Sequence, residues 1–387
     1  MIALPALPLL GDFLRGVPPD PETAARIPPA EWSALLDWLA DENLLPLFRH
    51  WLSELPAPAI ETSLPEAIGE RMDREYRGTV ARNLLLAEEL TAILLRLGEA
   101  DHTCIPIRGL ALAEELFGDP FLRPMGDIDL LVPRRDLSRF GEAMAELGYR
   151  RMDRRPGYAE DFYYTLKFIK KRYGWIIVEP RWSLAYPPFH EQLDMAAVFD
   201  RCRTGRVLDI DVEQLSDEDL ILHLSLHLMH EGPSAPFLRF YELDRLIRRS
   251  SVGLDWSLLT ASAVNSGQGF LLGRALRLLI GHLCTPVPVE VLETLPDKPP
   301  PTRAGRLADL LASGSDIDGR ESLALFVATR GIRTKLRYLL ALFFPVPDFM
   351  MLQYGLTRRR QLIPAYARRV FYFFREGVRG VLKLIFG

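Results

Sequence analysis

Cysteine is scarce in this sequence. Only 3 of its 387 residues are cysteines, and they lie far apart, at Cys104, Cys202 and Cys284. This spacing fits neither a metal-binding knuckle nor a framework of disulfides. We therefore expect a protein of a reducing compartment, and the cytoplasm is the simplest assignment.

Long apolar runs are also missing. No uninterrupted stretch reaches the roughly 18 apolar residues that a membrane-spanning helix needs. The first residues are apolar, but they lack a basic start and are interrupted by Pro5 and Pro8, which is not typical of a signal peptide. The formal charge of −4 gives no indication of a specific nucleic-acid partner. We expect a soluble globular protein with room for two or three domains.

The strongest functional signal lies between Ile105 and Val132. The pattern predicts a strand over 105–107, a turn at Arg108-Gly109, a helix over 110–116 and a strand that carries Asp127 and Asp129. Alternate strand residues share a face, so the two carboxylates lie about 7 Å apart on one side of the sheet. They repel each other unless a cation lies between them. Because hard oxygen ligands favour Mg²⁺ or Mn²⁺, the sequence predicts a site for one of these ions.

These residues carry a family resemblance. Ile107-Arg108-Gly109, then Arg123, then GDIDLLV resemble segments of an uncharacterised bacterial nucleotidyltransferase-like family, which has the nucleotidyltransferase fold of the polymerase-beta-like superfamily. The resemblance implies a third carboxylate on a later strand, and Glu179 in WIIVEPRW is the matching residue. The family usually has Lys-Gly where this chain has Arg-Gly, and often a histidine where it has Arg181.

The resemblance extends loosely from about Arg77 to the C-terminus and implies an α+β fold. In that fold a nucleotidyltransferase-like mixed β-sheet core with helices is flanked by N-terminal and C-terminal helical regions. We place the N-terminal helical region at 1–75, the core at 76–215 and the C-terminal helical domain at 216–387. Periodicity and turn residues predict helices at 77–100 and 137–147, a hairpin over 162–184, a strand over 206–212, a helix capped by Ser216, and helices near 236–249, 256–265, 268–284, 303–313, 320–345 and 364–386.

The preferred hypothesis is Mg²⁺-dependent transfer of an NMP group from an NTP, with ATP expected, to an unidentified small molecule, peptide or protein. Such chemistry needs positioning and charge neutralisation, which metal ions supply. Asp127 and Asp129 hold the metal in this hypothesis. Glu179 completes the metal site or acts as a base on the acceptor.

Four residues are candidates for nucleotide binding. The backbone at Gly109 can approach phosphate oxygens at the start of a helix. Arg108 suits bidentate phosphate contact, and Arg123 and Arg181 are similar candidates. Arg123 could instead pair with an acid such as Asp119, and Arg181 could neutralise Glu179.

Two other functions stay open. A catalytically inactive nucleotide-binding or scaffold protein of a biosynthetic operon is favoured by the lack of a serine after Gly109 and by the long interval to Asp127. A glycosyltransferase using Asp127-Ile128-Asp129 would need a large parallel sheet before the motif, whereas residues 1–100 look helical.

Three further motifs have ordinary alternatives. Asp209 and Asp211 form a rival pair, but a solvated edge strand explains them. His223, His227 and His230 share a helix face without the HExxH pattern of zinc enzymes, so they indicate packing or, with Asp244, a position beside the site or the acceptor. Residues 355–387 contain eight Lys or Arg and one acid, interleaved with aromatics. They favour a packed helix with a basic outer face, a peripheral membrane contact or an RNA contact.

Overall fold

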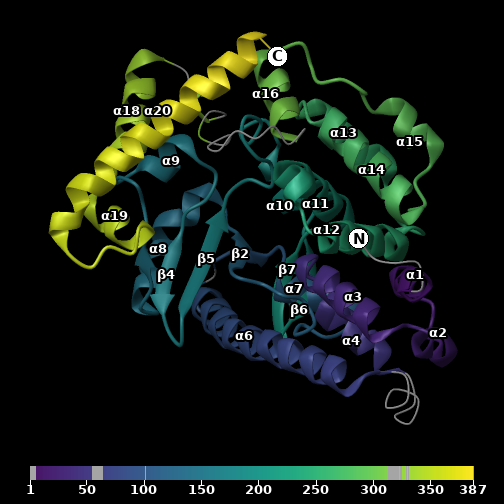
Figure 1. Cartoon of the computed structure of the whole chain (residues 1–387). Helices are drawn as coiled ribbons and strands as arrows, with labels where there is room; N and C mark the ends of the chain where they lie inside the picture. Colours follow the sequence, from purple (N-terminus) through teal and green to yellow (C-terminus); the bar gives the residue numbers. More distant parts are fainter. Residues whose placement is uncertain are drawn as a thin grey trace.

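The computed structural model describes residues 6–54, 64–100, 102–312, 322, 325–327, 329 and 331–386 (Figure 1). The described helices are α1 (Leu7–Arg15), α2 (Pro21–Ala25), α3 (Pro29–Asp41), α4 (Leu45–Leu52), α6 (Glu66–Gly98), α7 (Leu110–Phe117), α8 (Leu137–Glu146), α9 (Tyr158–Phe162), α10 (Met195–Asp200), α11 (Asp217–Glu231), α12 (Phe237–Ser250), α13 (Trp256–Asn265), α14 (Gly269–Leu283), α15 (Val289–Thr294), α16 (Arg303–Ala312), α18 (Ile332–Phe343), α19 (Pro347–Gln353) and α20 (Leu362–Phe386). The strands are β1 (Ile105–Pro106), β2 (Ile128–Leu131), β3 (Arg150–Arg151), β4 (Phe168–Lys171), β5 (Trp175–Arg181), β6 (Arg203–Val207) and β7 (Ile210–Gln214).

A mixed five-stranded sheet lies at the centre, with the strand order β1-β2-β5-β4-β3. β2 and β5 are parallel, and the other neighbouring strands are antiparallel. The parallel register places Asp129 opposite Glu179 and Ile128 opposite Val178. This mixed sheet among helices confirms the predicted α+β class.

The two faces of the sheet differ in chemistry. Ile128, Leu130 and Val178 are buried in an apolar cluster with residues of α6 and α8. Because strand side chains alternate, the carboxylates of Asp129 and Glu179 emerge on the opposite face. The apolar face fixes the register, since a slip of one residue would bury the acids among leucines.

Helices from both ends of the chain pack around the core. The N-terminal helices form an apolar cluster that includes Leu238 and Tyr241 of α12, and Phe13 stacks on Tyr241 with ring centroids 5.4 Å apart. α6 runs without a break across residue 75, where we expect the first domain boundary. In Figure 1 the yellow helices α18–α20 lie beside α9, and the backbone N–H of Val346 donates to the carbonyl of Arg154 at 2.8 Å. Among the described residues, no helix is long and apolar enough to cross a bilayer.

The local predictions need two corrections. The strand predicted over 206–212 is the two-stranded hairpin β6–β7, because Leu208 and Asp209 adopt positive φ values of 51° and 64° and reverse the chain. The helix predicted over 320–345 lies partly outside the described residues. In the described part, α18 begins after Gly331 and Pro345 separates it from α19.

Candidate active site

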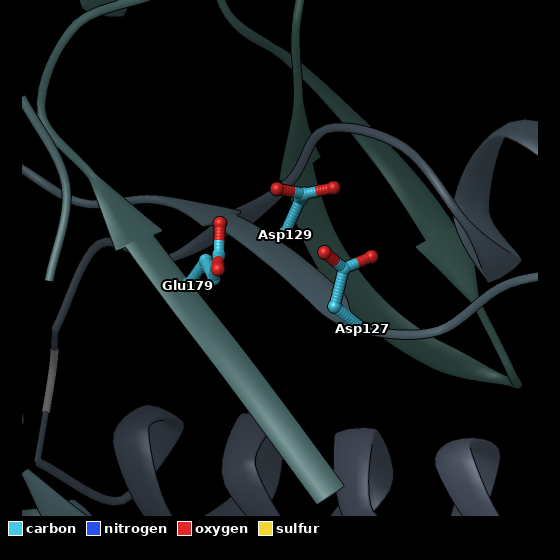
Figure 2. Close-up of side chains that lie close together, drawn as sticks. All are labelled: Asp127, Asp129 and Glu179. Atoms are coloured by element: carbon cyan, nitrogen blue, oxygen red, sulfur yellow. The ribbon is translucent and has the colours of Figure 1, made fainter. Parts of the chain in front are cut away.

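Three carboxylates meet on the polar face of the sheet. Asp127 precedes β2, Asp129 lies within it, and Glu179 lies on the parallel neighbour β5. One oxygen from each of the three residues lies within 4.8 Å of the others, and Figure 2 shows the side chains pointing toward one another. The residues predicted to bind a metal are therefore brought together.

Cations of the chain itself neutralise two of these acids. Arg108 and Arg181 each form an ion pair with Asp129, and all three side chains are buried. Lys167 pairs with Glu179 at 2.9 Å. Within the described part of the chain, Asp127 has no ion pair. The cluster thus contains three carboxylates and three cationic side chains, and Arg181 contacts both Asp129 and, at 4.0 Å, Glu179.

Burial is the largest single influence on the pKa of Asp127 and on that of Asp129. It raises the pKa of Asp127 to about 6, with a further contribution from the Asp129 carboxylate and an opposing one from Arg108. At Asp129 burial acts in the same direction, but Arg108 and Arg181 outweigh it and hold the pKa well below its usual range. Asp129 therefore stays ionised, and Asp127 is the one of the two aspartates that is protonated more easily.

A closed ring of polar contacts fixes the two arginines. Arg181 donates to the Tyr186 hydroxyl at 3.2 Å, and this hydroxyl lies 2.6 Å from Nδ1 of His227. Nε2 of His227 contacts Arg108, and both arginines return to Asp129. Nε2 also lies 3.0 Å from Oε1 of Glu231, so this nitrogen faces both a guanidinium that only donates and a carboxylate that only accepts. Burial, reinforced by Arg108, lowers the pKa of His227 well below its usual value, which agrees with a neutral ring.

A pocket of about 360 Å³ opens onto Asp127 and Asp129. Gly109 lines it at the start of α7, with a φ of 65° and a ψ of −123° that side chains rarely permit. Arg108, Arg123 and Arg239 also line this pocket. The pocket therefore combines carboxylates, guanidinium groups and the amino end of an eight-residue helix.

Arg123 is held by a second line of charges. It is buried and pairs with Glu242 of α12, not with Asp119. Arg239 lies 3.6 Å from Glu242 and 3.0 Å from Glu231, and Glu231 lies 3.0 Å from His227. These contacts connect the pocket rim to α11 and α12.

Sequence reasoning did not identify Lys167, Tyr186, Glu231, Arg239 or Glu242. Tyr186 lies in an irregular segment with no recognisable pattern. Lys167 reaches Glu179 only because β4 and β5 form a hairpin. The local signals available were the spacing of Arg239 and Glu242 and the spacing of His227 and Glu231, each pair on a predicted helix.

Other predicted residues lie further from the carboxylates. His223 is buried behind Tyr186, and its Nδ1 lies 2.9 Å from the Leu184 carbonyl oxygen. The ring of His230 stacks on the ring of Tyr186, with the two centroids 4.3 Å apart. Asp244 forms its contacts with Arg245, Arg248 and Thr285 in the helical region. The side chains of the rival pair, Asp209 and Asp211, are 96% and 82% exposed, and both contact Arg206.

The mixed sheet and its helices are those of a nucleotidyltransferase-like fold. The chain belongs to the family described as uncharacterised nucleotidyltransferase, which matches residues 28–280, and this confirms the predicted family and the assignment as a probable nucleotidyltransferase. The match runs from the start of α3 into α14. It leaves α1, α2 and α15 to α20 outside.

A comparison with curated proteins finds no match. Two solved structures of the antibiotic-resistance factor ANT(2'')-Ia are similar at 17% sequence identity. The solution structure has a TM-score of 0.35 and covers 52% of this chain and 98% of its own. The crystal structure with adenylyl-2''-tobramycin has a TM-score of 0.33, and the similarity covers 47% of this chain and 97% of that one.

Proposed function

We propose that this protein transfers an NMP group from an NTP, with Mg²⁺ as its metal ion, to an acceptor hydroxyl or phosphate. The observation that carries the proposal is the convergence of Asp127, Asp129 and Glu179 beside an arginine-lined pocket. The acceptor oxygen forms a bond to the α-phosphorus while the bond to the bridging oxygen breaks. Pyrophosphate leaves with the electron pair, and the proton of an acceptor hydroxyl passes to solvent.

The donor set fits a hard divalent ion. Three carboxylates supply oxygen ligands only, which suits Mg²⁺ and also Mn²⁺. When bound, the ion neutralises the charge that develops on the phosphates. Asp127 and Asp129 would hold it, and Glu179 would complete the site. Partial burial of Asp127 without an ion pair is the arrangement expected of a ligand that awaits a cation.

The chain's own cations suggest how nucleotide and metal bind together. Arg108 and Arg181 are neutralised by Asp129 in the described structure. A divalent ion on the carboxylates would leave these guanidinium groups in excess, and phosphate oxygens would then restore the balance. Metal and nucleotide should therefore each bind weakly alone and strengthen one another, a reciprocal coupling. Gly109 and Arg123 would contact the same phosphates from the pocket rim.

A catalytically inactive, nucleotide-binding protein is the second candidate. The observation that favours it is the double occupation of Asp129 by buried arginines, which competes with a metal. ATP is the expected nucleotide and the cytoplasm the expected location.

ATP labelled at one of two positions separates the two candidate functions. The protein is incubated with Mg²⁺, a mixture of small hydroxyl compounds, and ATP labelled either at the α-phosphorus or at the γ-phosphorus. Nucleotidyl transfer attaches the α-label to an acceptor and releases the γ-label as pyrophosphate. Mg²⁺-dependent binding without transfer of either label supports the inactive alternative, and attachment of the γ-label alone contradicts both.

A further inference from the structure

A second pocket meets the carboxylates from another side. It measures about 210 Å³ and is lined by Glu179 and Lys167, by aromatic residues that include Tyr163 and Tyr164, and by Phe349 and Gln353 of α19. Asp127 and Asp129 line the first pocket but not this one, whereas Glu179 lines this one but not the first. The three-carboxylate cluster therefore lies between two pockets.

We propose that this second pocket binds the acceptor, and that the acceptor is a small hydroxyl compound with a flat or apolar body and an anionic group. This inference rests on the proposed nucleotidyl transfer. In that reaction the acceptor oxygen and the leaving pyrophosphate lie roughly in line across the phosphorus. Two pockets that are each lined by part of one carboxylate cluster fit this requirement, with Glu179 on the acceptor side.

The charge of the lining selects the acceptor class. Arg151, Arg154 and Lys167 line the pocket against Asp153 and Glu179, and Arg151 also pairs with Glu160 outside the lining. A metal on the carboxylate cluster would take Glu179 from Lys167, whose side chain is 41% exposed. Its ammonium group would then be available for an acceptor anion. A polycationic acceptor would meet repulsion instead.

The aromatic rings and α19 define the body of the acceptor. Phe349 forms one wall, and the guanidinium of Arg369 lies 5.7 Å from its ring centroid, behind that wall. Rings of this kind bury flat or apolar groups. Phe349 and Gln353 lie outside residues 28–280, the segment that matches the family. The C-terminal helices therefore contribute one wall of this pocket.

Three probes that share one ring test the charge preference. Binding of para-hydroxybenzoate, para-hydroxybenzamide and tyramine is measured by ligand-observed NMR on the full chain with Mg²⁺ and a non-hydrolysable ATP analogue. We expect the anion to bind about tenfold more tightly than the cation, as a charge-assisted contact predicts. Equal affinities, a preference for tyramine, or no binding of any probe would overturn the proposal.

Two variants locate the binding. Lys167→Gln should reduce the affinity for the anion alone, whereas Lys171→Gln, at an exposed lysine that ends β4, should not change it. Gln353→Trp should fill the pocket and abolish binding of all three probes. Calorimetry of Mg²⁺-ATP on the same variants keeps the two proposals distinguishable. Loss of probe binding with intact nucleotide binding supports the pocket, and probe binding without any nucleotide binding would contradict only the proposed function.

A different observation concerns the outer surface of α18 and α20. Exposed apolar residues recur at helical spacing on both helices, at Ile332, Leu336 and Leu340 and at Ile363, Ala367, Phe371 and Phe374. Exposed arginines lie on the same two helices and in the segment just before α20. They are Arg333 and Arg337 in α18, Arg358, Arg359 and Arg360 before α20, and Arg368 and Arg375 in α20. The same pattern on two packed helices is typical of an interfacial amphipathic surface.

We infer that this surface binds an anionic lipid membrane. Over residues 331–375 the sequence has nine Lys or Arg and one acid, Asp348, although the whole chain carries a formal charge of −4. A second copy of the chain would bring two surfaces of the same sign together, which opposes self-association. An anionic bilayer satisfies both the charge and the apolar stripe.

Vesicle co-sedimentation tests this surface. We expect the full chain to bind vesicles of phosphatidylcholine with one-quarter phosphatidylserine, but not phosphatidylcholine alone, and to be released by salt. Arg368→Gln/Arg375→Gln should reduce binding about thirtyfold, since two basic residues near an anionic surface together contribute about 2 kcal/mol. Phe371→Ser/Phe374→Ser should reduce binding at least about fivefold through the loss of buried apolar area. The controls Val252→Ser, at a residue 99% exposed elsewhere, and Arg26→Gln should not. No binding, equal binding to both vesicles, or unchanged variants would contradict the inference.

Discussion

The chain contains the tripeptide Asp-Ile-Asp twice, at 127–129 and at 209–211, and its two settings differ in almost every respect. The first pair lies at the beginning of a strand buried in a mixed sheet, with Glu179 on the parallel neighbour. The second lies at a hairpin turn with both side chains in solvent. The local sequence is the same, so the burial and the surrounding charges decide which pair can form a site.

The largest difference should appear on truncation. Asp129→Ala leaves Arg108 and Arg181 buried without their carboxylate, so we expect the free energy of unfolding to fall by about 3–5 kcal/mol. Asp211→Ala should change it by less than about 0.5 kcal/mol, as usual for an exposed site. Urea unfolding of both variants measures the contrast. Similar losses in the two would mean that the buried ion pairs do not distinguish the sites.

A pH effect should come from the surroundings of the first pair. Burial lowers the pKa of His223 to about 3, so below the usual value near 6.5 the unfolded chain gains a proton that the folded chain does not. Stability therefore falls as the pH decreases from about 6.5, by up to about 1.4 kcal/mol per pH unit for this residue.

Paired variants isolate this contribution. Urea unfolding is measured between pH 7 and pH 5. His223→Gln should reduce the slope of the free energy of unfolding against pH by up to about 1.4 kcal/mol per pH unit, which corresponds to one proton. His50→Gln, at an exposed histidine, is the matched control variant. An unaltered slope in His223→Gln would show that this ring is protonated in the folded protein.

Asp127 should behave in the opposite way to Asp129. It lies close to two other carboxylates and has no ion pair in the described structure, so removal of its charge relieves repulsion. We expect Asp127→Asn to raise the free energy of unfolding of the metal-free protein by about 1 kcal/mol. The matched change Asp209→Asn should have no measurable effect. Destabilisation by Asp127→Asn would indicate that this carboxylate has a structural partner.

The smallest effect should come from the turn that contains the second pair. Asp209 adopts a φ of 64°, which glycine accepts without steric cost. Asp209→Gly should therefore stabilise the protein by less than about 1 kcal/mol. Thermal unfolding measures this change, and a clear decrease in the midpoint would exclude backbone strain at this turn.

The comparison also shows how far the sequence predicts the structure. The family resemblance supplied Glu179 and the fold, and strand alternation supplied the common face of Asp127 and Asp129. The hairpin at Leu208-Asp209 was missed because its turn lacks the Asn-Gly signal of such loops. Lys167 and Tyr186 were missed because their contacts depend on strand pairing and on an irregular segment. Non-local pairing of this kind leaves little trace in a single sequence.

The most direct test of the account is a calorimetric titration of ATP with and without Mg²⁺. It compares the unaltered protein, Asp127→Asn, and the matched control Asp209→Asn/Asp211→Asn. We expect Mg²⁺ to strengthen ATP binding at least about tenfold in the unaltered protein and the control, and Asp127→Asn to lose most of this gain. Mg²⁺-independent binding, or an undiminished Mg²⁺ effect in Asp127→Asn, would contradict a metal-nucleotide site at the first pair.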